Sequence, residues 1–281
     1  MRDSQGGFSE GRPELLDPER IRQHLARPPD ALRGLECVGE TRSTNADLLA
    51  RPADAVHRVA RLAERQTAGR GRRGRPWFSP HARNIYLSLG WRLDAGPDAL
   101  GFLPLVVAVA AARALDRLGF TGHGIKWPND LVTAKGKLGG CLVELRRIHT
   151  DGTLAVLGVG LNVRLTGAPG LEALDQPWDE LAGELPRISR NETAGRLLGA
   201  LLEAVEGFER AGLGAKGFDA FLADWNRFDR LAGRDVTIRS ERSTAHGRCL
   251  GLGPEGGLRI RTDGREREFH AGEVSVRRQA F

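Results

Sequence analysis

Residues 69–77 read GRGRRGRPW and hold four arginines and three glycines directly before a tryptophan. Like charges at this density repel one another, and glycine gives the backbone no preferred conformation. Glycine also lets backbone N–H groups approach a ligand closely, while the arginine fork binds carboxylates and phosphates. The stretch therefore predicts a loop that stays mobile until an anionic ligand orders it.

Two other interpretations of this loop remain open. It could be a solvated surface loop, because only four of the 42 basic residues are lysines and arginine is common everywhere in the chain. Residues 73–76 (RGRP) also match the core of an AT-hook, which lays arginines along a narrow minor groove. Such hooks lie in disordered sequence, whereas apolar residues flank this loop on both sides: Val59, Leu62 and Ala63, then Ile85, Leu87, Leu89 and Trp91. Those flanks predict strands of a folded core, so we expect no specific DNA binding.

The lysines give a second signal. Three of the four lie within residues 126–137, in the motifs KWPND (126–130) and KLGGCLVE (137–144). In a chain that uses arginine almost everywhere, this cluster favours a site that needs a compact ammonium group.

Composition sets the class of protein. The chain has 281 residues, of which 40% are hydrophobic and 28% charged, and this suits one large domain and one small one. Three widely spaced cysteines predict neither a disulfide framework nor a paired metal site. The N-terminus lacks the apolar segment of a signal peptide, and the longest apolar run, residues 102–112, is too short to span a bilayer. We therefore expect a cytoplasmic protein without a membrane partner, and a buried helix at 102–112.

Periodicity and turn signals divide the chain into three parts. Residues 1–14 are expected to be disordered, 15–230 to mix strands and helices, and 231–281 to form a small barrel of short strands. A capping box from Thr44 to Asp47 starts one helix, and residues 167–186 are irregular with one short helix. Strands are expected at 35–40, 58–64, 84–93, 125–127, 130–134, 137–147 and 154–163, and helices after Asp17 and at 101–118, 192–210 and 218–226. Barrel strands are expected at 235–239, 244–252, 257–261, 266–270 and 273–277.

Five motifs in series resemble the biotin protein ligases. They are Ser43-Thr44-Asn45, Gln66 with the arginine loop, KWPND, KLGG, and GVGLN at residues 158–162. The resemblance runs from about Leu15 to the C-terminus. It implies an α+β fold: a mixed β-sheet with helices, like the catalytic domain of class II aminoacyl-tRNA synthetases, followed by an SH3-like barrel. Members of this family join biotin to ATP, giving biotinyl-5′-adenylate and pyrophosphate. They then pass biotin to one lysine of a carboxylase carrier domain.

Three features distinguish this chain from other members of the family. Some bacterial members carry an N-terminal DNA-binding domain, and this chain resembles the ligase-only kind. Gly139 and Cys141 stand where a small and an aliphatic residue are usual, and Arg42 stands where Asp or Ser is common. The resemblance leaves the oligomeric state open, with a homodimer among the alternatives.

The resemblance assigns biotin to a set of polar and glycine residues. Hydroxyls and amides suit the ureido ring, which offers one acceptor and two N–H donors. Plain helix capping stays an alternative for Ser43 and Thr44. The residues are Ser43, Thr44, Asn45, Gln66, Gly69, Arg70, Gly71, Arg72, Lys137 and Gly140.

ATP binding follows from the same resemblance. Its residues are Arg72, Arg75, Trp77, Lys126, Asn129, Asp130 and Asn162. Trp77 would stack on adenine, unless it packs in the core. Asn162 would reach the phosphates or the metal, with Gly158 and Gly160 giving clearance. Mg²⁺ is implied by ATP, but its ligands are unassigned.

The chemistry needs cations rather than a protein nucleophile. A carboxylate must approach the α-phosphate of ATP, and both are anions. The catalytic residues are expected to be Lys137 beside both groups, Arg72 bridging them, and Asp130, which could accept a proton from the incoming lysine. Arg70 would hold the loop closed, and Arg73 is a bystander.

The expected partner is the biotin carboxyl carrier protein or domain of a biotin-dependent carboxylase. Basic residues of the barrel could steer an acidic carrier: Arg234, Arg239, Arg242 and Arg248. Alternatively, Arg277 could reach into the ATP site. A lipoate or octanoate ligase or transferase of the same superfamily is the nearest rival function, although it needs a longer apolar slot.

Overall fold

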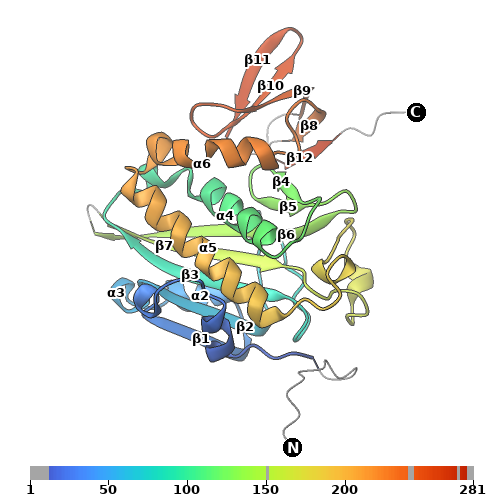
Figure 1. Cartoon of the computed structure of the whole chain (residues 1–281). Coiled ribbons are helices and arrows are strands. Elements are labelled where there is room, and N and C mark those ends of the chain that lie inside the picture. The colour runs from blue at the N-terminus through green and yellow to red at the C-terminus, as the bar shows by residue number, and fades with distance from the viewer. Residues whose placement is uncertain (1–12, 150–151, 240–243, 271–272, 277–281) are drawn as a thin grey trace, which may run out of the picture.

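In a computed structural model, the described residues are 13–149, 152–239, 244–270 and 273–276. They form a seven-stranded sheet with helices and a separate five-stranded sheet near the C-terminus (Figure 1). This confirms the predicted α+β class.

The large sheet has the strand order β1-β2-β3-β7-β6-β5-β4. Its strands are β1 (Gly34–Thr41), β2 (Val59–Gln66), β3 (Ile85–Leu93), β4 (Gly124–Lys126), β5 (Asp130–Val132), β6 (Lys137–His149) and β7 (Gly152–Leu161). The β1–β2 pair is parallel, and α2 (Thr44–Leu49) and α3 (Ala53–Val56) form the connection between these strands. All other neighbours in this sheet are antiparallel, so the sheet is mixed as predicted.

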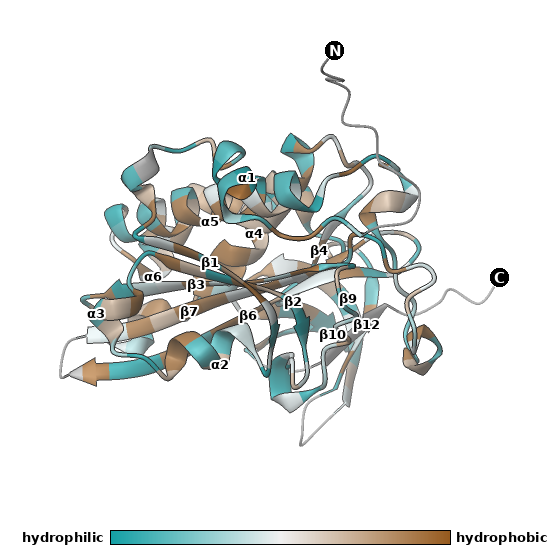
Figure 2. Ribbon diagram, turned by 90° about the horizontal axis from the view of Figure 1, so that it is seen from below, coloured by the Kyte–Doolittle hydropathy of each residue, from teal (hydrophilic) through white to brown (hydrophobic). Residues whose placement is uncertain are grey.

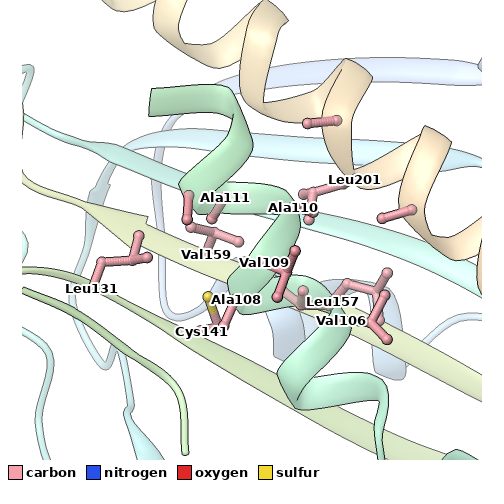
Figure 3. Close-up of a cluster of buried hydrophobic side chains, with 14 of the residues drawn as sticks. Val106, Ala108, Val109, Ala110, Ala111, Leu131, Cys141, Leu157, Val159 and Leu201 are labelled. Carbon is pink, nitrogen blue, oxygen red and sulfur yellow. The ribbon is translucent and has the colours of Figure 1, made fainter. Parts of the chain in front are cut away.

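Different helices lie on the two faces of the sheet. Figure 2 shows α1 (Pro18–Gln23), α4 (Leu103–Arg117) and α5 (Arg190–Arg210) on one side and α2 on the other. Because successive side chains of a strand point to opposite faces, the odd-numbered residues of β3 and β7 face α4 and α5. They join one hydrophobic core, which includes Ile85, Leu87, Leu89, Leu157, Val159 and Leu161. Figure 3 shows Leu157 and Val159 beside α4. The alternation predicted for 84–93 is confirmed.

The apolar segment Pro97–Arg117 contains a 3₁₀ turn (Pro97–Leu100) and α4. By length and composition this segment could cross a membrane, but most of it is buried inside the protein. Val106, Val109 and Ala110 pack between the sheet and α5, next to Leu201 (Figure 3). The segment is therefore the core helix expected from residues 102–112.

Several predicted boundaries are wrong by a few residues. Ser43, not Thr44, caps α2, and its hydroxyl accepts the Ala46 N–H at 3.4 Å. The reason is that Ser43 has an extended backbone, whereas Asp47 is bound to the Thr41 hydroxyl at 2.7 Å. Helix α6 (Gly214–Phe228) begins before the predicted Phe218. Residues 167–186 contain two 3₁₀ turns, Leu171–Ala173 and Leu181–Gly183, rather than one short helix.

Glu14 ties the N-terminal stretch to the start of α5. Residues 1–12, most of the predicted disordered segment, lie outside the described residues. Glu14, also predicted to be disordered, instead accepts hydrogen bonds from the Ser189 hydroxyl at 2.8 Å and the Arg190 N–H at 2.6 Å. A short 3₁₀ turn (Pro29–Ala31) then leads into β1.

The C-terminal sheet is antiparallel, with the order β11-β10-β9-β8-β12. Its strands are β8 (Asp235–Arg239), β9 (Thr244–Leu252), β10 (Leu258–Thr262), β11 (Arg265–Phe269) and β12 (Glu273–Val276). The five predicted barrel strands are thus present, within one residue at each described end. Buried Val236, Ile238 and Ile260 belong to the same hydrophobic core as α4, so this barrel is packed on the larger unit.

Candidate active site

A cavity of about 360 Å³ lies on the sheet face opposite α4 and α5. Strand register explains its floor: Tyr86, Gly160, Gly140, Asp130 and Lys126 form one row across five strands. The two glycines in the middle of that row leave the sheet without side chains there. The arginine loop and the start of α2 form other parts of the wall.

All but two of the predicted site residues line this cavity. The residues brought together are Ser43, Thr44, Asn45, Gln66, Arg70, Gly71, Arg72, Arg75, Trp77, Lys126, Asn129, Asp130, Lys137 and Gly140. They come from five separate segments of the sequence, so the fold is what assembles them.

One end of the cavity is neutral and polar. Gln66 Oε1 accepts the Thr44 N–H at 2.9 Å and lies 3.2 Å from the Thr44 hydroxyl. The Ser88 hydroxyl lies 2.7 Å from Thr44 Oγ1 and 2.6 Å from Asn45 Oδ1. The Asn45 amide donates to the Glu144 carboxylate at 2.8 Å. These contacts fix hydroxyl and amide groups in place before any ligand arrives.

Sequence reasoning missed Ser88 and Glu144. Ser88 is fully buried on β3 and opposes Gly158 of β7, one row from the glycine floor. A polar residue at an even position of this otherwise apolar strand was the available signal. Glu144 is at the end of the KLGGCLVE motif, but nothing in its spacing indicates that it would bind Asn45.

The other end of the cavity is cationic. Lys137 Nζ lies 2.8 Å from Asp130 Oδ1 and 5.3 Å from the centre of the Trp77 ring. Burial lowers the pKa of the Arg72 guanidinium, and neighbouring Arg73 lowers it further, while Asp130 opposes the shift. A partly desolvated guanidinium beside another cation is stabilised by an anionic ligand. Asp130 is the only carboxylate lining the cavity in the described part of the chain.

The arginine loop folds back on itself. The Gly71 N–H donates to Arg75 O at 2.7 Å, and the Trp77 N–H donates to Gly69 O at 2.9 Å. A 3₁₀ turn (Arg72–Gly74) at its tip contains Arg73 with φ of 57°, in the left-handed region. The hairpin contributes Arg70, Arg72, Arg73 and Arg75 to the cavity wall, so Arg73, the expected bystander, lines it as well. Its ordering by a ligand stays a prediction.

Trp77 lies against the glycine floor. A Cβ atom added at Gly160 would come within 2.5 Å of the indole, and one at Gly140 within 3.5 Å. Likewise, a Cβ at Gly158 would be 2.4 Å from Asn45 Oδ1. Gly158 and Gly160 therefore give clearance to these two side chains, and their expected role beside the nucleotide stays a prediction. Trp77 both packs on the sheet and lines the cavity.

Two predicted residues lie outside the cavity wall. The Asn162 amide donates to Lys137 O at 3.2 Å and to Asp179 O at 3.1 Å, and Asn84 donates to its oxygen at 3.4 Å. These contacts tie Asn162 to the backbone beside Lys137 and do not support its expected contact with ATP or a metal. Gly69, the first residue of the loop, does not line the cavity, and a Cβ added there would meet Gln66 Nε2 at 2.8 Å.

The cavity offers no resident metal centre and no reactive thiol. The described residues contain no group of three His, Cys, Asp or Glu side chains that could hold a metal ion. Burial raises the pKa of the Cys141 thiol to about 12, so this cavity-lining cysteine stays protonated. The side chains that line the cavity are mainly basic residues and groups that form hydrogen bonds.

Comparison with known proteins agrees with this geometry. Residues 37–162 match the Biotin/lipoate A/B protein ligase family, and residues 232–277 match the biotin protein ligase C-terminal domain. The bifunctional ligase/repressor BirA of Salmonella typhimurium is 36% identical over 272 residues, covering 96% of this chain and 82% of the relative. The chain belongs to the biotin protein ligase family.

Other biotin protein ligases support the assignment. The biotin–[acetyl-CoA-carboxylase] ligase of Mycobacterium tuberculosis is 40% identical over 190 residues, covering 65% of this chain and 68% of the relative. The solved structure of the Aquifex aeolicus biotin protein ligase in complex with biotin and ATP is similar, with a TM-score of 0.73 and 28% identity. It covers 88% of this chain and 100% of that one.

Proposed function

We propose that this protein activates biotin with ATP and transfers it to a protein lysine. The observation that carries the proposal is the two-ended cavity, with fixed neutral polar groups at one end and several cations at the other. The two ends of biotin match the two ends of the cavity, since biotin has a neutral ureido ring at one end and a carboxylate at the other. The named relatives and the ligand-bound structural neighbour support the same activity.

The polar end is proposed to bind the ureido ring. Ser43, Thr44, Asn45 and Gln66 offer both hydrogen-bond donors and acceptors, as that ring requires. Because they already contact one another, little conformational entropy is lost when the ring binds. This end then directs the biotin carboxylate along the sheet toward Arg72 and Lys137.

The cationic end is proposed to catalyse adenylate formation. A carboxylate oxygen of biotin attacks the α-phosphorus, and the bond to the β-phosphate oxygen breaks, releasing pyrophosphate. Lys137 and Arg72 reduce the repulsion between the two anions and stabilise the charge of the transition state. Lys137 now contacts Asp130 at 2.8 Å, and we propose that its ammonium turns toward the substrate oxygens when both substrates are bound.

In the second step, the amine of a carrier lysine attacks the acyl carbon and AMP leaves. The amine must lose a proton, and Asp130 is the carboxylate in the cavity wall that could take it. Mg²⁺ fits Asp130 during the first step, because this ion uses few protein carboxylates and several phosphate oxygens. We propose that the ion enters with ATP.

The acceptor is proposed to be a biotin carboxyl carrier protein or domain in the cytoplasm. We also propose that residues 15–230 form the catalytic unit and 231–281 the barrel. The alternatives are less well supported: the cavity end near Asn45 is polar rather than a long apolar slot, which disfavours lipoate or octanoate. The arginine loop lines the cavity and its flanks are strands of a folded core, which disfavours an AT-hook.

Isothermal titration of the full chain with biotin, octanoate and an AT-rich DNA duplex tests this function. Of the three ligands, we expect only biotin to bind saturably. Adding ATP should then give biotin-dependent release of pyrophosphate. Tighter binding of octanoate, or binding of the duplex without any response to biotin, would overturn the proposal.

A further inference from the structure

The barrel contributes to the cavity through the end of β8. Arg239, the last residue of β8, lines the cavity together with Lys126 and Trp127 of the larger unit. Val236 and Ile238 on the same strand are buried in the shared core, while Arg239 is exposed. The strand therefore keeps Val236 and Ile238 in the core and places Arg239 at the cavity wall.

The position of Arg239 is fixed by contacts between the barrel and the KWPND segment. Trp127 Nε1 donates to Gly256 O in the β9–β10 turn at 3.1 Å. An added Cβ at Gly256 would lie 3.0 Å from the Phe102 ring, so the turn is in close contact with the start of α4. The Arg230 N–H, in the connection to the barrel, donates to Ile125 O of β4 at 2.9 Å. The barrel is thus bound to the strand that carries Lys126.

The charge balance at this end indicates which ligand Arg239 meets. Basic side chains from the loop, β4, β6 and β8 line the cavity, whereas Asp130 is its only carboxylate among the described residues. Asp130 is already paired with Lys137. A triphosphate offers this basic wall more anionic oxygens than a biotin carboxylate and one phosphate do.

We infer that Arg239 binds the β- and γ-phosphates of ATP, and so the pyrophosphate that leaves. This inference rests on the adenylating function proposed above. It makes the barrel part of the first chemical step, whereas sequence analysis gave Arg239 a role in steering the carrier. Arg242 and Arg277, the other barrel arginines considered for those roles, lie outside the described residues.

Other barrel arginines fit a phosphate site less well. Arg248 lies 3.9 Å from Asp235 and does not line the cavity. Arg261 donates to Glu266 at 2.9 Å on the exposed β10–β11 hairpin. Arg248 therefore provides a matched control, because it is a basic residue of the same barrel with an exposed side chain outside the cavity.

The test compares Arg239→Ala, Arg239→Lys and Arg248→Ala in the full chain, without carrier. We expect Arg239→Ala to raise the KM for ATP by about tenfold or more in biotin-dependent pyrophosphate exchange, as for loss of a charge-assisted hydrogen bond. Its affinity for biotinyl-5′-adenylate, which lacks the β- and γ-phosphates, should stay unchanged. Arg239→Lys should restore part of the ATP affinity, and Arg248→Ala should match the unsubstituted protein.

Two results would overturn the inference. An unchanged KM for ATP in Arg239→Ala would do so, even if a separate assay with the carrier shows a raised KM for the carrier. Equal weakening of ATP and biotinyl-5′-adenylate would also do so, because it would indicate a general structural effect. If the unsubstituted protein shows no biotin-dependent exchange, the proposed function fails instead, so the two failures are distinguishable.

Discussion

The two faces of the seven-stranded sheet have different roles, since one packs against helices in the hydrophobic core and the other lines the cavity. Odd-numbered residues of β3 and β7, including Leu87, Leu157 and Val159, are mostly apolar and belong to the core with α4 and α5. Even-numbered residues on the other face include Ser88, Gly158 and Gly160, which line the cavity. A shift of strand register by one residue would exchange the side chains of the helix-covered face and the cavity face. Stability and ligand binding are therefore separated by strand alternation, and substitutions on each face should have separable effects.

The largest expected effect is on the helix-covered face. Arg190 Nη2 lies 2.8 Å from Glu64 Oε2, and both side chains are at most 8% exposed. Arg190→Met would leave a buried carboxylate unpaired and should cost about 3–5 kcal/mol in free energy of unfolding. Urea unfolding followed by circular dichroism measures this.

Two controls separate the buried pair from helix effects. Arg196→Ala, in the exposed pair with Glu192 of the same helix, should cost under about 1 kcal/mol. Adding Glu64→Leu to Arg190→Met should recover much of the loss, because no unpaired charge then remains. An Arg190→Met protein as stable as the Arg196→Ala protein would contradict a structural role for this pair.

The cavity face should show the opposite pattern. Lys137→Ala removes a cation from the cavity and should cost roughly 2–4 kcal/mol in adenylate formation, with the free energy of unfolding little changed. Pyrophosphate release measures the step. Lys135→Ala is the matched control, since Lys135 is an exposed lysine of the same hairpin, with a side chain 70% exposed. Near-normal pyrophosphate release by Lys137→Ala would refute the assignment.

Gly158→Ala should weaken biotin binding with a smaller effect. The added Cβ would lie 2.4 Å from Asn45 Oδ1 and displace that side chain, at a cost of about 1–3 kcal/mol. Titration with biotin measures the loss. Gly39→Ala on β1 is the control, because its added Cβ meets nothing within 4 Å. Equal biotin affinity in the two variants would show that Asn45 does not need its present position.

The smallest effect on the chemistry itself is expected at the loop. If Arg70 holds the loop closed, Arg70→Gly or Arg70→Ser should still form the adenylate but release it faster. Free biotinyl-5′-adenylate would then acylate lysines of bystander proteins, which blotting for biotin detects. Arg65→Ser serves as the control, since Arg65 is an exposed arginine of β2 outside the cavity wall. Bystander labelling that stays at the level of the unsubstituted protein would argue against a closing role.

Local patterns in the sequence predicted the fold better than they predicted the contacts of the site. Alternation at Ile85, Leu87 and Leu89 predicted the helix-covered face, because burial of one strand face repeats every two residues. Motif order predicted which residues gather at the cavity. The contacts of Asn162 and Gly158 were missed, because they depend on partners from distant strands, and no periodic signal specifies such pairs. Arg239 was recognised as basic, but only the packing of the barrel places it at the cavity.

Hydrogen exchange with and without biotinyl-5′-adenylate tests most directly that the ligand binds at the cavity face of the sheet and not at the helix-covered face. The charged, glycine-rich loop should gain protection when the anion binds, so peptides covering residues 66–78 and α2 should exchange more slowly. Peptides from α4 and α5, on the other face, should not change. Equal protection of residues 66–78 in both states, or a gain confined to α4 and α5, would contradict the account.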